Sequence, residues 1–233
     1  ILLVFAMVGL SLGIENLANK QNAAWVSIAL IITGVVATLI YAFHAINHQN
    51  ALFRASLFKN RIFTIGILGN FFARFGGNAL PFLLPLMLQV AFGFDPFITG
   101  LLMIPTVLGS LASKPIIRPL IQRFGYRQVL LINTLLVGVC IASFALHTAD
   151  TPTWFRLIHF FIFGVLNSLQ FVSMNTLTLK DLSQQNASSG NSFLSMIMML
   201  SMSLGVALAG TLVNVFTQHL GTANTLQAFN YTL

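Results

Sequence analysis

Three polar residues spaced four apart carry the most informative chemistry in this sequence. Asn70, Arg74 and Asn78 lie in an otherwise apolar run from residue 62 to residue 92. At about 100° per residue, this spacing places the three side chains on one face of a helix. A guanidinium can bind a carboxylate or phosphate through two hydrogen bonds, and each side-chain amide both donates and accepts. The stripe therefore predicts a binding surface for a polar solute, or part of a proton pathway.

The composition places this stripe in a membrane protein. Hydrophobic residues make up 57% of the chain, charged residues 6%, and the mean hydropathy is +0.88, whereas about 25% of a soluble domain is charged. The net charge of +7 would indicate nucleic acid only if the basic residues shared a polar face. Because they lie in short segments between apolar runs, we expect the lipid bilayer as a partner and no nucleic acid.

The run that carries the stripe is too long for one straight span. Its roughly 31 residues would extend about 46 Å as a helix, against a hydrocarbon core of about 30 Å. Gly76, Gly77, Pro81 and Pro85 lie inside it and predict kinks, which membrane helices tolerate where neighbours or a cavity satisfy the freed carbonyls. Pro81 and Pro85 share the arc of the stripe, and so does Gln89.

Arg74 lies about 18 Å from the nearer end of this run, too deep for its side chain to reach the surface. An arginine near the bilayer centre costs about 2.5–3.5 kcal/mol on insertion scales. It should therefore face the bundle interior or a wet cavity, where it either lines a substrate or proton pathway or joins helices by hydrogen bonds. For Asn70, Asn78 and Gln89, hydrogen bonding between helices is the alternative to cavity lining.

The predicted fold is an all-α membrane protein with about seven transmembrane helices, the first of them truncated. The spans lie near 1–14, 25–43, 62–92, 97–117, 128–147, 153–176 and 191–216, followed by a polar tail. With Lys114, the segments 44–61, 118–127 and 177–190 contain eight of the 11 Lys and Arg residues. Because these residues accumulate on the cytoplasmic side, we predict that these three segments are cytoplasmic.

Other polar residues are sparse in the spans. Asn167 is a second candidate for cavity lining, with an interhelical hydrogen bond as the alternative. His159 could titrate near neutral pH but is interpreted as a packing histidine. Pro105, Gly109 and Ser113 indicate a bendable helix with a close neighbour. All four acidic residues, Glu15, Asp95, Asp150 and Asp181, lie at span edges or in loops. A carboxylate that carries protons must therefore belong to another part of the protein.

The sequence contains no arrangement typical of an enzyme. A nucleophile paired with a base, paired carboxylates, an HExxH motif and a glycine-rich phosphate loop are all missing. The single cysteine, Cys140, lies in an apolar run and supports neither a disulfide framework nor a thiolate metal site. We expect no catalytic residues, no metal and no cofactor.

The segment from Arg118 to Arg127 resembles a loop of the major facilitator superfamily. In that family an acidic residue, Arg or Lys, one residue, Gly, and Arg or Lys join the second and third helices of each half. Arg123, Gly125 and Arg127 match this pattern, while Gln122 replaces the acid. The runs 58–63, 74–85, 175–182 and 186–192 are similar to the fourteen-span drug:proton antiporter branch of the family.

The resemblance implies a half-bundle that works with a second half. Residues 1–52 would be two linker helices, and residues 53–233 the C-terminal half without its last helix. An N-terminal half of the same protein would supply the acidic residues, and the two halves would rock around a midplane site. The implied function is efflux of small amphipathic substrates across the bacterial inner membrane, driven by the proton gradient, with Arg123, Gly125 and Arg127 as a gating loop.

In this interpretation the substrate cavity is lined by residues from two spans, Asn70, Arg74, Asn78, Gln89 and Asn167. Two alternatives remain open. A cationic Arg74 also suits proton-coupled symport of an anionic or zwitterionic solute. A scaffold or sensor that transports nothing is the alternative from another class.

Overall fold

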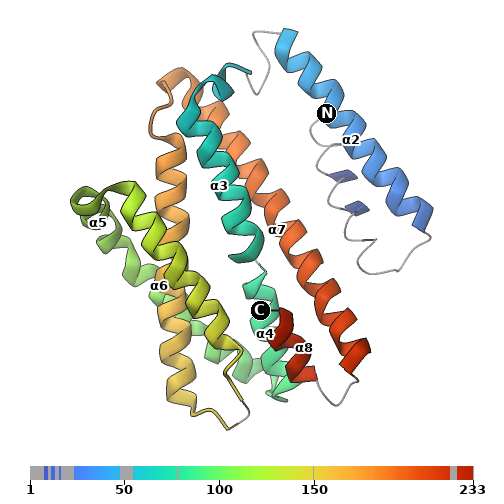
Figure 1. The fold of residues 1–233 in the computed structure, drawn as a ribbon, viewed down its shortest axis with the longest axis vertical. Coiled ribbons are helices and arrows are strands. Elements are labelled where there is room, and N and C mark those ends of the chain that lie inside the picture. The colour runs from blue at the N-terminus through green and yellow to red at the C-terminus, as the bar shows by residue number, and fades with distance from the viewer. Residues whose placement is uncertain are drawn as a thin grey trace. The chain divides into compact units, whose positions relative to one another are not determined.

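The computed structural model describes residues 8–9, 12–13, 16, 24–47, 55–77, 79–148, 150–220 and 225–232. All regular structure in these ranges is helical, which confirms the predicted all-α fold (Figure 1). The elements are α2 (Ala24–Asn47), η1 (Ala55–Lys59), α3 (Arg61–Gly77), α4 (Leu80–Leu86), η2 (Met87–Ala91), α5 (Pro96–Phe144), α6 (Thr153–Leu179), α7 (Gln184–Leu220) and α8 (Thr225–Thr232).

Four helical stretches of the described chain are long and apolar enough to cross a membrane. They are Arg61–Ala91, Pro96–Phe144, Thr153–Leu179 and Asn186–His219. The chain forms two compact units, which are described separately. Unit 1 contains Ile1–Ala79 and Leu177–Thr211, and unit 2 contains Leu80–Thr176 and Leu212–Leu233.

In unit 1, Gly9 and Gly13 of the first predicted span lie against α2. A Cβ added to Gly9 would lie 2.7 Å from the Leu30 carbonyl oxygen, and one added to Gly13 would lie 3.1 Å from that of Ser27. The later glycine, Gly13, contacts the earlier residue of α2, so the chain around Gly9 and Gly13 runs antiparallel to α2. Glycine allows this approach since it has no side chain, as in other tightly packed membrane helices.

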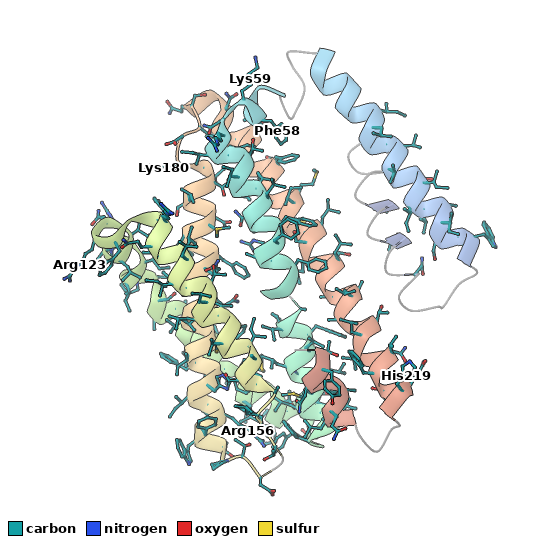
Figure 2. The ribbon with its side chains drawn as sticks, viewed as in Figure 1. Phe58, Lys59, Arg123, Arg156, Lys180 and His219 are labelled. Carbon is teal, nitrogen blue, oxygen red and sulfur yellow. The ribbon has the colours of Figure 1, made fainter. Side chains whose placement is uncertain are left out.

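The core of unit 1 lies between η1, α3, the C-terminal end of α6 and α7. Leu57, Phe63, Ile67 and Leu194 are buried together there. Phe58, labelled in Figure 2, places its ring edge-on to Phe193 with 5.2 Å between centroids, a geometry that aromatic pairs favour. This packing holds α3, which carries the polar stripe, against α7.

In unit 2, α5 is two helices joined at Gly125. That residue has φ 74° and ψ 159° inside an otherwise helical run, a backbone conformation essentially restricted to glycine. The part before Gly125 runs parallel to α6, since a Cβ on Gly164 would touch Thr106 and Ser168 bonds Ser113. The part after it is antiparallel to α6. The spans predicted at 97–117 and 128–147 are therefore both in α5.

The predicted loop at 118–127 is much shorter in the structure. Residues 118–124 continue the first part of α5, and the helix resumes directly after Gly125. The expected helix start at Asp95 and Pro96 is confirmed, because the Asp95 carboxylate accepts from the Phe97 N–H at 2.8 Å. Proline at the first helical position removes a donor that would have no partner in the helix.

The span from residue 61 to residue 91 is interrupted twice. Helix α3 ends at Gly77 and α4 begins at Leu80, so Pro81 lies in a first turn, where a missing N–H costs nothing. Pro85 lies inside α4 and is followed by η2, a π-helical turn closed by Phe92 N–H donating to the Met87 carbonyl at 3.2 Å. Proline removes one hydrogen bond of the ladder, and the wider turn accommodates the change.

The polar segment expected after residue 216 is helical over most of its described residues. Helix α7 continues to Leu220, and α8 follows, with Ala228 and Phe229 buried. The ring of Tyr231 lies 5.7 Å from that of Phe216. The polar residues of this segment masked two apolar positions that tertiary packing buries.

Candidate functional site

The buried arginine of the predicted polar stripe is partnered within its own helix. Arg74 is 7% exposed, and its Nε–H donates to the Asn70 side-chain oxygen at 3.4 Å. The two residues are one helical turn apart, so their side chains meet on one face of α3. The i, i+4 spacing therefore produces a direct contact between an arginine and an amide within unit 1.

Asn70 connects this arginine to α6. Its Nδ2 group donates to the Gly66 carbonyl at 3.1 Å and to the Thr178 hydroxyl at 2.9 Å, and its side chain is fully buried. The close approach depends on Gly66, because an added Cβ would lie 2.9 Å from the Thr178 Cα. Asn70 thus makes the interhelical hydrogen bond that was the alternative to cavity lining, and it also accepts from Arg74.

Of the other predicted cavity residues, the structure describes Gln89 and Asn167. Asn78 is outside the described residues. Gln89 is exposed on η2, and Asn167 is half-buried on α6. Gln89 and Asn167 belong to unit 2, whereas Asn70 and Arg74 belong to unit 1.

A polar ladder that sequence reasoning missed joins α5 to α6 in unit 2. Asn133 donates to the Leu166 carbonyl at 2.9 Å and to the Gln170 side-chain oxygen at 2.8 Å, while Gln170 donates to Thr134 at 2.9 Å. Nearer the start of α5, Ser113 donates to Ser168 at 2.7 Å. Side-chain amides facing each other across membrane helices are typical of such packing. These residues could not be identified from local sequence, because their partners lie far away in the sequence.

Gly109 makes the close contact predicted for its helix. A Cβ at this position would meet the Phe161 carbonyl and lie 3.0 Å from the Val165 nitrogen. The expectation that Gly109 and Ser113 mark a helix with a close neighbour is therefore confirmed.

The residues of the proposed gating loop are at the turn of α5. Arg123, Gly125 and Arg127 are all exposed, and the Arg123 guanidinium lies 5.4 Å from the Phe124 ring centroid. Figure 2 shows Arg123 and Arg156 at opposite ends of the helices of unit 2. The turn thus presents two cations together at one end.

At the other end of unit 2, Arg156 is unexpectedly buried. It is 1% exposed, with its guanidinium carbon 4.8 Å from the Phe92 ring centroid and 5.0 Å from that of Phe94. It also donates to the Thr148 carbonyl. Aromatic faces stabilise a cation that has lost water. The sequence suggested an arginine at a span edge, and the tertiary structure surrounds it with rings.

Two histidines are buried beside this arginine. His147, in the loop between α5 and α6, is 1% exposed, and its Nε2 lies 2.8 Å from His159 Nδ1. Burial, followed by the charges of His159 and Arg156, lowers the pKa of His147 to about 4. His159 is hydrogen-bonded and packed, as predicted, but its partnership with His147 was missed. Both residues flank one interhelical turn, which was the available signal.

None of the described residues forms a metal-type cluster of three His, Cys, Asp or Glu side chains. The polar chemistry of the described residues is instead that of hydrogen bonds and buried charge. Arg74 with Asn70 can recognise an acceptor, and the histidine pair can take up a proton.

Comparison with known proteins identifies the family of this chain. The family model described as Major Facilitator Superfamily matches residues 66–220. A protein of Escherichia coli O6:H1 is 44% identical to the chain over 237 residues, and one of Shigella flexneri is 43% identical over the same length. Both carry the name multidrug resistance protein MdtD, given provisionally. All of the chain is covered in each case, and the chain spans 50% of each relative's length.

Proposed function

This chain belongs to the Major Facilitator Superfamily, and from that premise we propose that it is the C-terminal half of a multidrug efflux transporter of the bacterial inner membrane. Residues 1–52 are the linker helices, and residues 53–233 are the half-domain without its last helix. An N-terminal half of the same protein supplies the opposite wall of the path. The identity to MdtD proteins over the whole chain supports this assignment.

The proposed mechanism is alternating access coupled to the proton gradient. The two halves rock around a site near the bilayer midplane, where broken helices expose backbone groups. The break between Gly77 and Leu80 and the π-turn after Pro85 supply such backbone in the span that carries Arg74. Small amphipathic substrates leave as protons enter, and no cofactor takes part.

The buried Arg74–Asn70 contact is the observation that carries the proposal. Placing a cation within a membrane span costs free energy, and charges found there usually mark a transport path. Asn70 orients Arg74, and Asn78, Gln89 and Asn167 are proposed as cavity residues on the sequence pattern alone. Arg123, Gly125 and Arg127 form the cytoplasmic gate in this proposal, and the segments 44–61, 118–127 and 177–190 face the cytoplasm.

The test is transport by the full-length protein in proteoliposomes. Ethidium, a cationic amphipathic dye, is the probe, and its flux is measured with and without a pH gradient. Arg74→Ala is expected to abolish gradient-driven flux, while Arg61→Ala, at an exposed position on the same helix, leaves it unchanged. Arg74→Ala that inserts normally and extrudes ethidium at the original rate would contradict the role of Arg74.

Proton-coupled symport of an anion is the second candidate, and the positive charge of Arg74 favours it. Carboxyfluorescein is its probe in the same vesicles. Movement of this anion in the direction of the protons, with no ethidium flux, would replace antiport by symport. If neither probe nor any proton moved, the scaffold or sensor alternative would stand.

A further inference from the structure

We propose that His147 and His159 form one proton-binding site through which protons enter this half of the transporter, with His147 Nδ1 as the accepting atom. The inference rests on the proposed function for its role in coupling. The site itself follows from the geometry of unit 2, which contains all the residues involved.

The tautomer of His159 follows from its partners. His159 Nε2 lies 3.2 Å from the Cys140 carbonyl oxygen and 2.9 Å from Ser143 Oγ. A carbonyl oxygen only accepts, so Nε2 must carry the hydrogen. The Ser143 hydroxyl donates to the same carbonyl at 2.8 Å, which leaves its oxygen free to accept from His159. In the neutral imidazole, Nδ1 of His159 is then an acceptor.

The tautomer of His147 follows in turn. Its Nε2 lies 2.8 Å from the accepting His159 Nδ1, so Nε2 carries the hydrogen and donates. Nδ1 of His147 is left with a lone pair. This atom is buried and has no hydrogen-bond partner among the described residues. From donor to acceptor, the hydrogen bonds therefore run from His147 through His159 to Ser143. The unused acceptor is Nδ1 of His147, at the start of this chain.

A proton can be added to this chain at one place without breaking a bond. Binding at His147 Nδ1 forms an N–H bond from its lone pair and gives an imidazolium whose Nε2–H still donates to His159. The Nε2 hydrogen can then move to His159 Nδ1, which leaves His147 neutral with its hydrogen on Nδ1. One proton has been gained, no electrons have been exchanged, and the charge has moved from the loop onto α6.

Burial, followed by the charges of His159 and Arg156, disfavours protonation of His147 in the arrangement described. From α6, Arg156 places a positive charge beside it, and from α5 the nearest titratable residue is Cys140. Helix η2 carries no titratable residue, the Asp95 that follows it caps α5, and α8, which packs on η2, contributes only Tyr231. Asp150, in the same loop as His147, is exposed.

Proton binding then depends on opening of this end of the unit. Phe144 stacks on His159 with 4.0 Å between ring centroids, and Phe155 and Phe160 also pack against His147. Burial by these rings contributes most to the lowered pKa of His147. If the loop opens to water, the pKa of His147 returns toward its ordinary value of about 6.5. On the predicted orientation this end faces outward, so the site loads from the side where protons are abundant.

The first experiment reads the site without requiring transport. The full-length protein is labelled with ¹⁵N-histidine in bilayers, and the ring nitrogens of His147 and His159 are followed by solid-state NMR as the pH is lowered. His147→Gln and His159→Gln assign the signals. We expect both neutral rings to carry hydrogen on Nε2, and one proton to bind the pair, at His147 Nδ1. Before any proton is bound, hydrogen on Nδ1 of His147 instead of Nε2 would overturn the proposal, and so would two independent titrations.

The second experiment tests coupling. His147→Gln retains a side-chain N–H toward His159 but cannot be protonated, whereas His219→Gln makes the same exchange at an exposed histidine. We expect His147→Gln to lose gradient-driven ethidium flux and the accompanying proton uptake while ethidium exchange without a gradient persists. His219→Gln should retain both. Unchanged coupling in His147→Gln would overturn the role of the site.

The two experiments can contradict the proposed function and the histidine site independently of each other. If the unmodified protein moved no ethidium under any gradient, the proposed function would be wrong, and the NMR titration would still decide whether the pair binds a proton. If transport were coupled but the pair bound no proton, the proposed function would stand and the histidine site would be wrong.

Discussion

Asn70 donates its side-chain N–H to the Thr178 hydroxyl oxygen over 2.9 Å and so joins α3 to the last turn of α6 within unit 1. The same side chain accepts from Arg74. One buried amide therefore orients the intramembrane arginine and holds two helices together, and its replacement should affect both stability and transport.

The hydrogen bond between Asn70 and Thr178 can be measured by a double-mutant cycle of Asn70→Leu and Thr178→Val. Interhelical hydrogen bonds in membranes contribute about 0.6 kcal/mol on average and at most about 1.7 kcal/mol. We expect a coupling energy in that range for the free energy of unfolding in bicelles. Thr64→Val combined with Asn70→Leu is the control, because the Thr64 hydroxyl donates to the Phe58 and Asn60 carbonyls, so the two changes should be additive within about 0.5 kcal/mol. Additivity of the first pair would show that their contact does not stabilise the fold.

Gly66→Ala should destabilise the protein by about 1–3 kcal/mol, because a methyl group would be forced against the Thr178 backbone. Gly76→Ala on the same helix has open space within 4 Å and should be neutral or stabilising by up to about 1 kcal/mol, since alanine is the better helix former. Free energies of unfolding of the two variants provide the comparison. Equal effects would mean that α3 and α6 do not pack closely at this point.

Gly125→Ala should cost about 1–3 kcal/mol for a conformational reason alone. The residue has φ 74°, and nothing lies within 4 Å of the position a Cβ would take. Gly138→Ala, later in α5 and also in open space, is the matched control and should not destabilise. A tolerated Gly125→Ala, measured by thermal unfolding, would indicate that the turn of α5 does not require this backbone conformation.

Stability should fall as the pH is lowered from about 6.5 to about 4 because of His147. Its folded pKa is about 4, so in this window the unfolded chain binds the proton that the folded chain excludes, and protons favour unfolding. The loss should be on the order of 1–3 kcal/mol. Unfolding of the unmodified protein and of His147→Gln is compared at pH values across the window. His147→Gln should lack this part of the decline, and identical pH profiles would contradict the prediction.

Several features of the fold could be predicted because they depend on residues close in sequence. Apolar runs of the length of a bilayer predict helices, and Asp95 followed by Pro96 predicts where α5 begins. The motif around Gly125 predicts a turn, although α5 is helical up to that residue. The burial of Phe229, in the polar segment after residue 216, could not be predicted because it depends on tertiary packing.

The candidate site was predicted only in part for the same reason. The spacing of Asn70 and Arg74 places them on one face, and they contact each other. Their partner Thr178 is more than a hundred positions away, and nothing local to either residue indicates it. The burial of Arg156 against Phe92 and Phe94 likewise joins the start of α6 to the segment before α5, and the whole of α5 separates the two in sequence.

Sequence alone determined that this chain lies in a membrane, that it is helical, and that Arg74 is a deeply placed charge on a polar stripe. Those conclusions need only composition, periodicity and the cost of charge in lipid. The tertiary structure decided which buried polar groups pair: Asn70 with Thr178, Asn133 with Gln170, and His147 with His159. Inside a membrane a polar group must find its partner within the protein, and that partner is set by which helices lie side by side.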